Sequence, residues 1–329
     1  ERSTSVYLAD RVIPMFPTEI SNDLCSLNPH IERLTQSVLM EINHQGKVID
    51  YKFYQSFIKI NERMTYDNVR KILVEKDKEI SKRYESLIDM FSNMEELAKI
   101  LKEKRIIRGA IDFNFPEVKV ILDEKGKPKD IKKVERSIAE ELIEEFMLIC
   151  NETVAGHFYK LQTPFLYRTH DRPSDDKMID FRDFIYNLGY SLPGKPEEAD
   201  PLMLQKVLKE VEGTQEEKVI NTILLRSRQQ ASYSKSNSGH FGLAAKNYSH
   251  FTSPIRRYPD LVIHRILKEV LKEGTLDKKK GQKLSKKMPD IARHTSLRER
   301  RAMEAERESV DYKKVEFMED KVGEVFTGV

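Results

Sequence analysis

Two adjacent arginines stand between two prolines in the stretch HFTSPIRRYPDLVIHR, residues 250–265. Pro254 and Pro259 restrict the backbone on either side of Arg256 and Arg257, so the segment loses little conformational entropy when it binds a ligand. A guanidinium group carries a permanent positive charge and five donors in a planar fork, which suits a phosphate group. The stretch therefore predicts a rigid anion-binding loop immediately before a helix.

The residues around this loop add flat rings and hydroxyl groups to the positive charge. Between positions 231 and 265 aromatic residues alternate with small hydroxyl residues; the aromatic ones are Tyr233, Phe241, Tyr248, Phe251 and Tyr258. Such a mixture suits single-stranded nucleic acid, because bases stack on rings while hydroxyl and amide groups contact phosphates. Each ring taken singly is equally consistent with a place in the hydrophobic core. Both alternatives stay open from the sequence.

A cluster of acids in HDRPSDDK offers a second possible chemistry. The cluster could supply the carboxylate ligands of a two-metal site; its acids are Asp171, Asp175 and Asp176. Ser174 precedes two of them, however, and acids in the first turn after a helix cap stabilise the helix dipole. The helix-start interpretation is the better one.

Composition places the chain among globular proteins with one large domain or two smaller ones. Its 329 residues are 39% hydrophobic and 34% charged, and no apolar run is long enough to span a membrane, so no membrane partner is expected. The motifs GxxxxGK[ST], GxGxxG after a strand, HExxH, CxxC and GxSxG are absent. The sequence thus offers no support for a nucleotide cofactor, for zinc or for a serine hydrolase.

Cysteine content and charge distribution bear on the cellular compartment and on the type of binding partner. Cys25 and Cys150 are the only cysteines, which favours a reducing compartment, the cytoplasm, with both thiols buried. The net charge is +3, but basic residues gather at 129–136, 278–287 and 293–301. Such clusters are consistent with a polyanion-binding surface or with a solvated face.

The first half of the chain predicts hairpins and helices in alternation. Residues 33–59 alternate in hydrophobicity around an Asn-His-Gln-Gly turn, and residues 118–134 do so around a second turn. Helical periodicity covers 66–104 and 137–158, and a strand is expected at 163–170.

The second half predicts mostly helices around a long loop. Ser174, Asp200-Pro201 and a Thr214/Glu217 capping box each mark a helix start. Residues 230–258 show no periodicity, which indicates an ordered functional loop. Helices are expected from Pro259 to Leu271 and over 284–318, with Pro289 limiting how far back the second can begin. Hairpins and blocks of helices together predict an α+β fold with mixed, largely antiparallel strands.

Long motifs in this sequence resemble the RNB-type exoribonucleases, the family of ribonuclease II and ribonuclease R. They are SNSGHFGLAAKNYSHFTSPIRRYPDLVIHR, TSVYLADRVIPMFPTEISNDLCSLNPHIERL, LIEEFMLICNETVA and AMEAERESVDY. RRYPDLVIHR and FLYRTHDRPS are closer to ribonuclease R. The matches run from residue 3 to residue 329.

The resemblance implies an activity and a substrate path. Family members degrade RNA from its 3′ end, releasing nucleoside 5′-monophosphates processively by magnesium-assisted hydrolysis, and single-stranded RNA threads a channel into a buried site. Tyr7 in TSVYLAD matches the tyrosine at the 3′ end of the substrate, and Phe113 in GAIDFNFP matches the clamping phenylalanine. Two such rings stack on bases independently of sequence.

Four further residues match family positions. Tyr66 in MTYDNV matches a catalytic-site tyrosine near the scissile phosphate, and Arg256 matches the catalytic arginine. Glu144 and Glu306 match acids that line the RNA path. Without the family, both acids are ordinary exposed helix residues, and Tyr66 merely precedes a helix cap at Asp67.

The sequence departs from the family pattern at its ends. The family's magnesium-binding aspartates are expected upstream of Glu1, so no metal ligand is assigned within the chain, and Mg²⁺ is expected only in the complete enzyme. Residues 1–318 are expected to form the RNB-type domain without its N-terminal part, and 319–329 the first strand of an OB-type RNA-binding barrel. By itself the chain is expected to bind RNA weakly and not to hydrolyse it, unless it pairs with the missing N-terminal part.

Three functions remain to be compared. The first is a ribonuclease R-like 3′→5′ exoribonuclease, and the second is an RNB-like module that binds RNA without cleaving it. An aspartate-rich run upstream of Glu1 would favour the enzyme. The third is a helical interaction protein, which requires the aromatics of 231–265 to be core and predicts no salt-dependent RNA binding.

Overall fold

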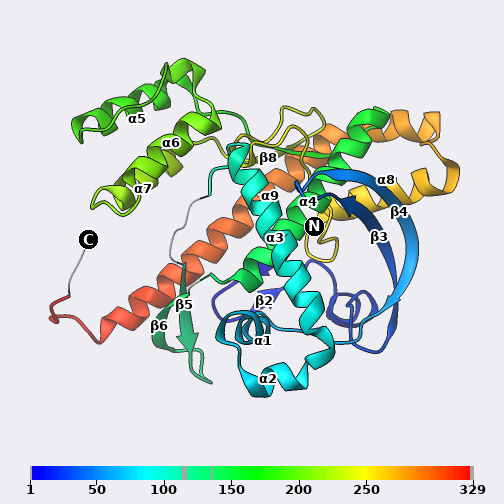
Figure 1. The fold of residues 1–329 in the computed structure, drawn as a ribbon, viewed down its shortest axis with the longest axis horizontal. Coiled ribbons are helices and arrows are strands. Elements are labelled where there is room, and N and C mark those ends of the chain that lie inside the picture. Colours follow the sequence, from blue (N-terminus) through cyan, green and yellow to red (C-terminus); the bar gives the residue numbers. More distant parts are fainter. Residues whose placement is uncertain (1, 113–116, 135, 327–329) are drawn as a thin grey trace.

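The fold is α+β, as the sequence predicts. The computed structural model describes residues 2–112, 117–134 and 136–326, with the side chain of Glu117 left undescribed. Within these ranges the strands form two-stranded antiparallel sheets, and helices make up most of the remainder (Figure 1).

Both predicted hairpins are confirmed. The paired strands are β1 (Val6–Tyr7) with β2 (Val12–Ile13), β3 (Glu32–Ile42) with β4 (Val48–Lys59), β5 (Glu117–Leu122) with β6 (Pro128–Val134), and β7 (Tyr167–Thr169) with β8 (Ser232–Ser234). Gly46 closes the first long hairpin with φ +69°, a conformation that glycine adopts without steric cost. The strand predicted for 163–170 is shorter than expected, because only three residues find a partner strand.

The helices are α1 (Tyr66–Arg70), α2 (Lys78–Arg83), α3 (Ile88–Ile107), α4 (Ile138–Leu161), α5 (Asp175–Asn187), α6 (Pro201–Val211), α7 (Glu217–Ser227), α8 (Tyr258–Glu273) and α9 (Lys278–Glu319). The helical stretch predicted for 66–104 is interrupted. Lys76 adopts a left-handed conformation after a π-helical turn, and Asp77 then caps a new helix through the N–H groups of Glu79 and Ile80.

The predicted limit at Pro289 is wrong. Helix α9 begins at Lys278, where the Asp277 carboxylate accepts a hydrogen bond from the Lys280 N–H at 2.9 Å, and Pro289 lies inside the helix. Met288 and Ala292 on either side of the proline are buried in the core. Their packing offsets the helical hydrogen bond that proline removes.

Two of the predicted caps differ from the structure. Asp200 accepts from Met203 N–H as expected, whereas Ser174 holds the N-cap position of α5 without a side-chain hydrogen bond. The Thr214/Glu217 capping box is wrong, because α7 begins only at Glu217, whose carboxylate instead accepts from the Gly213 N–H.

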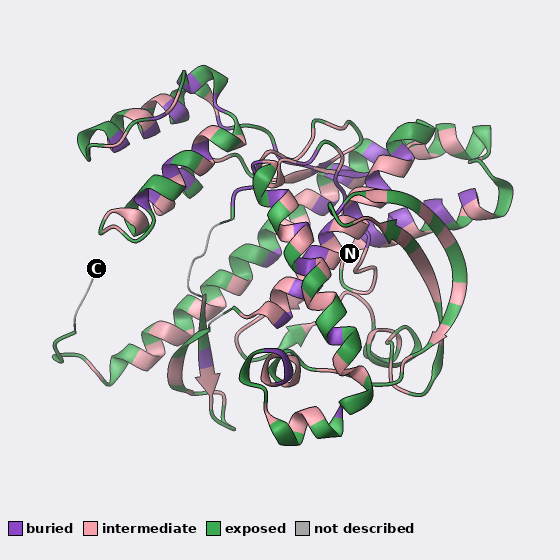
Figure 2. Ribbon diagram, viewed as in Figure 1, coloured by how far each residue is buried: buried purple, intermediate pink, exposed green. Residues whose placement is uncertain are grey.

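Four hydrophobic clusters hold the described elements together, and the smallest contains Leu148, Ala245 and Tyr248. The largest joins α4, α8, α9, β7 and β8; a second lies among α5, α6 and α7; and a third joins the α1–α3 region to α4. Figure 2 shows buried residues gathered where α4, α8 and β8 meet and again within the α5–α7 group. Tyr233, Tyr248 and Phe251 are buried in this interior, so the base-stacking alternative is wrong for these three rings.

The cysteine prediction is half wrong. Cys25 follows a short helical turn that contains no buried residue, and it is exposed. Cys150 on α4 is partly buried against the main core, and burial raises the pKa of its thiol to about 12. It therefore stays a neutral thiol at physiological pH.

The chain beyond α9 leaves the barrel-strand prediction open. Residues 320–326 form a turn and an irregular segment. Residues 327–329 lie outside the described part of the chain, so the strand and the boundary at residue 318 stay predictions.

Candidate functional site

A buried ion pair fixes the loop that carries the two arginines. Arg257 donates from Nε and Nη2 to the two carboxylate oxygens of Asp260 at 2.9 and 2.7 Å, and Asp260 also accepts from the Ser253 N–H at 2.7 Å. Asp260 is 0% exposed. Burial alone would lower the pKa of Arg257, but Asp260 raises it, so the guanidinium group stays charged. Arg257 is thus occupied in holding the loop, one of the roles expected for it.

Arg256 has the opposite surroundings. Its side chain is exposed and forms no hydrogen bond or ion pair with any residue that the structure describes. Its backbone is fixed, because the Arg256 carbonyl accepts from Ser5 N–H at 2.9 Å and the Arg256 N–H donates to the Ser253 carbonyl. A rigid backbone therefore presents a guanidinium group that is free to bind an anion.

The N-terminal segment connects this loop to α9. Tyr258 N–H donates to the Ser3 carbonyl at 2.9 Å, which places the following residues beside the arginine loop. Tyr7 N–H then donates to the Glu306 carboxylate at 2.8 Å. Three predicted site residues, Tyr7, Arg256 and Glu306, are thereby brought onto one connected surface from segments that are far apart in the sequence.

Tyr7 and Glu306 have different roles on this surface. Tyr7 is 45% exposed, so its ring is accessible to a base. Glu306 uses a carboxylate oxygen to hold the backbone of Tyr7, which is a positioning role and not that of an ordinary exposed helix acid.

No hydrogen bond or ion pair among the described residues joins the other predicted residues to this surface. Tyr66 is the half-exposed first residue of α1, whose cap is Thr65 and not Asp67. Glu144 is ion-paired with Arg136, so its charge is neutralised. Phe113 lies outside the described residues.

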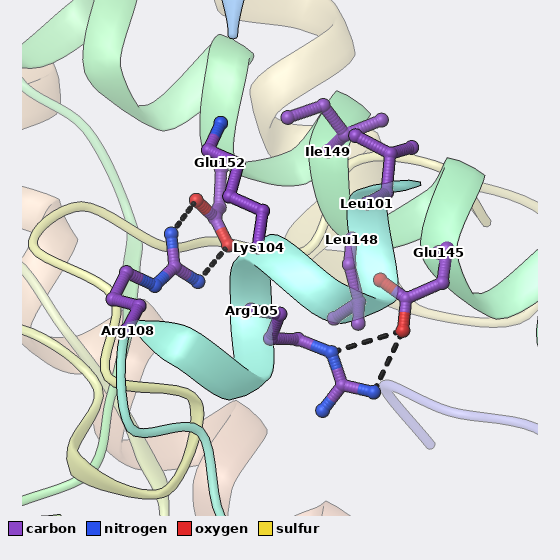
Figure 3. Close-up of a pocket in the computed structure, with 8 residues that line it drawn as sticks. All are labelled: Leu101, Lys104, Arg105, Arg108, Glu145, Leu148, Ile149 and Glu152. Atoms are coloured by element: carbon purple, nitrogen blue, oxygen red, sulfur yellow. Dashed lines mark hydrogen bonds and ion pairs between the residues drawn. The ribbon is translucent and has the colours of Figure 1, made fainter. Parts of the chain in front are cut away.

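Ion pairs join the C-terminal end of α3 to α4 (Figure 3). Arg105 donates to Glu145 at 2.7 and 2.9 Å, and Arg108 forms a bidentate pair with Glu152 at 2.7 and 2.8 Å. Arg108 also donates to the Leu243 carbonyl at 3.0 Å. The pairs thus tie α3 to α4 and to the loop that leads to Arg256.

Sequence reasoning missed these pairs, although a signal was present. Arg105 and Arg108 are three residues apart, and Glu145 and Glu152 are seven apart, so each set lies on one helix face. Only the packing of the two helices shows that the faces meet.

A buried group of histidines and tyrosines underlies the same loop. The Tyr233 hydroxyl and His250 Nδ1 lie 2.7 Å apart, and the rings of His170 and His240 are 5.0 Å apart. Gly242 N–H donates to His170 Nδ1 at 3.0 Å, which leaves His170 Nε2 as the donor to the Gln229 carbonyl at 2.8 Å. His170 is therefore held as the neutral tautomer.

These histidines are expected to make the fold acid-sensitive. Burial lowers the pKa of His170 to about 4 and that of His240 to about 3. In the unfolded chain both bind a proton below about pH 6.5. The free energy of unfolding should therefore fall as the pH drops from about 6.5 to about 4, by about 1.4 kcal/mol per pH unit for each histidine. Urea unfolding between pH 7.5 and pH 5 measures this slope.

Matched variants test the assignment. His240→Gln should flatten the slope, whereas His44→Gln should leave it unchanged because His44 is exposed. An unchanged slope in His240→Gln would show that this histidine is not the source.

The described residues do not fit a metal centre. No group of three or more His, Cys, Asp or Glu side chains in them has the geometry to hold a metal ion. In the acid cluster, Asp175 is paired with Arg172, and Asp171 accepts a hydrogen bond from Ser238 Oγ at 2.7 Å. No catalytic step is therefore assigned to a metal held by these residues.

Comparison with known proteins identifies the family. The RNB domain family matches residues 1–273. The chain belongs to the RNB domain family. This membership favours the two RNA-binding hypotheses over the helical interaction protein, even though three of the aromatic side chains on which that alternative depended are buried.

Three relatives of this RNB domain protein are named ribonuclease R. Ribonuclease R 1 of Lactococcus lactis is 50% identical over 329 residues, which are 100% of this chain and 40% of the relative. Ribonuclease R of Thermotoga maritima is 46% identical over 100% of this chain and 46% of the relative. Ribonuclease R of Escherichia coli is 40% identical over 100% of this chain and 41% of its own length. The chain thus spans less than half the length of these relatives.

Solved structures share the fold of this RNB domain. Mycoplasma genitalium RNase R in complex with double-stranded RNA aligns with a TM-score of 0.92 and 29% identity, over 99% of this chain and 58% of that one. The same enzyme with ribose-methylated single-stranded RNA aligns with a TM-score of 0.90 and 28% identity, over 98% of this chain and 50% of that one. Yeast Ssd1, a pseudonuclease, has the same fold at a TM-score of 0.70 and 23% identity, over 94% of this chain and 37% of its own. The fold alone therefore does not decide between cleavage and binding.

Among the described helices, none is both long and apolar enough to cross a membrane.

Proposed function

We propose that the complete protein containing this chain is a 3′→5′ exoribonuclease that degrades single-stranded RNA processively to nucleoside 5′-monophosphates in the cytoplasm. The observation that carries the proposal is the surface formed by Tyr7, Arg256 and Glu306, in a chain whose relatives are named ribonuclease R. It combines an accessible ring with a free guanidinium group on a fixed backbone. The ring can hold the strand end by stacking, and the guanidinium group can stabilise charge on the phosphoryl oxygens.

Each group has a separate task in this mechanism. The Tyr7 ring stacks on a base at the 3′ end of the strand, and Glu306 holds the backbone of Tyr7 in place. Arg256 stabilises the negative charge that develops on the phosphoryl oxygens as water attacks. We propose that Mg²⁺ binds in the complete protein to aspartates upstream of Glu1, as the resemblance to the family implies.

The alternative is an RNB-like module that binds RNA without cleaving it. A pseudonuclease has the same fold, so the fold is compatible with this candidate as well. Incubating the complete protein with 5′-labelled single-stranded RNA and Mg²⁺ separates the two. Conversion of the labelled RNA to short products without accumulating intermediates supports the processive exonuclease, and chromatography of the released nucleotides should identify nucleoside 5′-monophosphates. Intact RNA that stays bound in EDTA supports the module.

Removal of the Tyr7 ring tests how the strand end is held. Tyr7→Ala is expected to weaken binding of a single-stranded oligonucleotide by about 1–3 kcal/mol, because one base loses its stacking partner. Fluorescence anisotropy without Mg²⁺ measures binding in the absence of cleavage. Tyr54→Ala is the matched control, because Tyr54 on β4 is also 45% exposed. Equal affinities of the two variants would exclude Tyr7 as a base contact.

A further inference from the structure

A groove lies between the C-terminal end of α4, the connection to β7, and the first turns of α9. Two pockets with volumes of about 430 and 380 Å³ form it. Both are lined by residues 162–164 and by Ser285, so they are continuous with one another. Each volume falls in the range of sites that bind small molecules.

This groove is separate from the surface that carries Arg256. Met288 lines the groove and Glu306 holds Tyr7, and the two residues are 18 positions apart on α9. A helix rises 1.5 Å per residue, which separates the two sites by about 27 Å along α9. In Figure 1 the first turns of α9 lie beside the end of α4, across the molecule from the end of α9 beside β6.

A tyrosine hydroxyl group without a partner among the described residues lines the groove. Tyr167 is 6% exposed, and its hydroxyl group forms no hydrogen bond with the part of the chain that the structure describes. Burial and the neighbouring Tyr159 raise the pKa of Tyr167 to about 12. The group therefore remains a hydrogen-bond donor at neutral pH. No described residue uses this donor, so it is available to a ligand in the groove.

The other lining groups suit a nucleotide. Tyr159 is 55% exposed and offers a ring to a base, and Lys235 offers an ammonium group to a phosphate. Pro289 has no N–H group, so the Ser285 carbonyl lacks its usual helical donor and is left as an acceptor. Stacking, positive charge and polar contacts are thus available in one place.

The positive charge continues along the helix beside the groove. Residues 278–287 contain six lysines and no acid. Lys280 is paired with Glu269, and the other five form no ion pair in the described ranges. A polyanionic strand is favoured there over a neutral ligand or an apolar peptide.

We propose that this groove binds single-stranded RNA through its nucleoside phosphate units, as a second site distinct from the Arg256 surface. The inference rests on the proposed function only in taking RNA as the ligand. The accessible ring of Tyr159 contacts a base, Tyr167 and Lys235 contact phosphate oxygens, and the α9 lysines attract the adjoining strand.

Crosslinking to an oligonucleotide that contains 4-thiouridine tests the proposal on the complete protein in EDTA. A crosslink is expected on the peptides that contain Tyr159 or Lys235, and it should persist in Tyr7→Ala. The double variant Tyr159→Ala/Lys235→Ala should reduce it about fivefold or more, which corresponds to the loss of one base stack. Tyr167→Phe keeps the ring and removes only the hydroxyl group, so a reduced crosslink there does not depend on misfolding. Tyr186→Ala, an exposed tyrosine on α5, should leave the crosslink unchanged.

The outcomes separate the groove from the proposed function. A crosslink confined to the Tyr7 peptide would overturn the proposal that the groove binds RNA and would leave the proposed function intact. The absence of any crosslink would overturn both. An unlabelled strand should displace the groove crosslink at a lower nucleotide concentration than uridine 5′-monophosphate does. Equal displacement would overturn the assignment of a strand and identify a free mononucleotide as the ligand.

Discussion

Replacing Arg256 with alanine is expected to lower the turnover rate of the complete protein on single-stranded RNA by about 10²–10³-fold, or about 3–4 kcal/mol. The guanidinium group is exposed, lacks a protein partner in the described residues, and stands on a backbone held by Ser5 and Ser253. It is therefore preorganised to stabilise charge that appears only during cleavage. Affinity for RNA should change only modestly, because the ground-state phosphate carries less of that charge. Single-turnover rates and anisotropy measure the two quantities.

A nearby arginine supplies the control for this experiment. Arg265 on α8 is also exposed and forms no ion pair with other described residues, so Arg265→Ala should leave turnover close to wild type. An equal loss of binding and turnover in Arg256→Ala would identify Arg256 as a plain phosphate contact. Wild-type turnover would remove it from the mechanism.

Replacing Asp260 with alanine is expected to lower the free energy of unfolding by about 3–5 kcal/mol. The carboxylate is fully buried and accepts hydrogen bonds from Arg257 and from the Ser253 N–H. Its removal leaves the mostly buried Arg257 charge without a partner. Urea unfolding at neutral pH measures the loss.

The first turn of another helix offers the matched control. Asp176 occupies the corresponding part of α5 but is exposed and forms no ion pair in the described residues. Asp176→Ala should cost less than about 1 kcal/mol, the usual contribution of an exposed acid to a helix dipole. A similar small loss for Asp260→Ala would show that the buried pair does not hold the loop.

The sequence determined the features that depend on neighbouring residues. Alternating hydrophobicity and a turn specify the β3–β4 and β5–β6 hairpins, because each strand finds its partner a few residues away. The acids after Ser174 likewise mark the start of α5. Long motifs around Tyr7 and Arg256 also identified the family, since they could be read without knowing where they lie in space.

The tertiary structure decided which of these residues act together and which are buried in the core or in internal ion pairs. Tyr7 and Glu306 are 299 positions apart, and only the docking of the N-terminal segment on α9 joins them. Arg256 and Arg257 look alike in the sequence. In the fold, Arg257 is ion-paired with the buried Asp260, whereas Arg256 stays exposed. Packing likewise placed Tyr233, Tyr248 and Phe251 in the interior and carried α9 through Pro289. Each outcome depends on contacts between distant segments, and local patterns contain no information about which faces will meet.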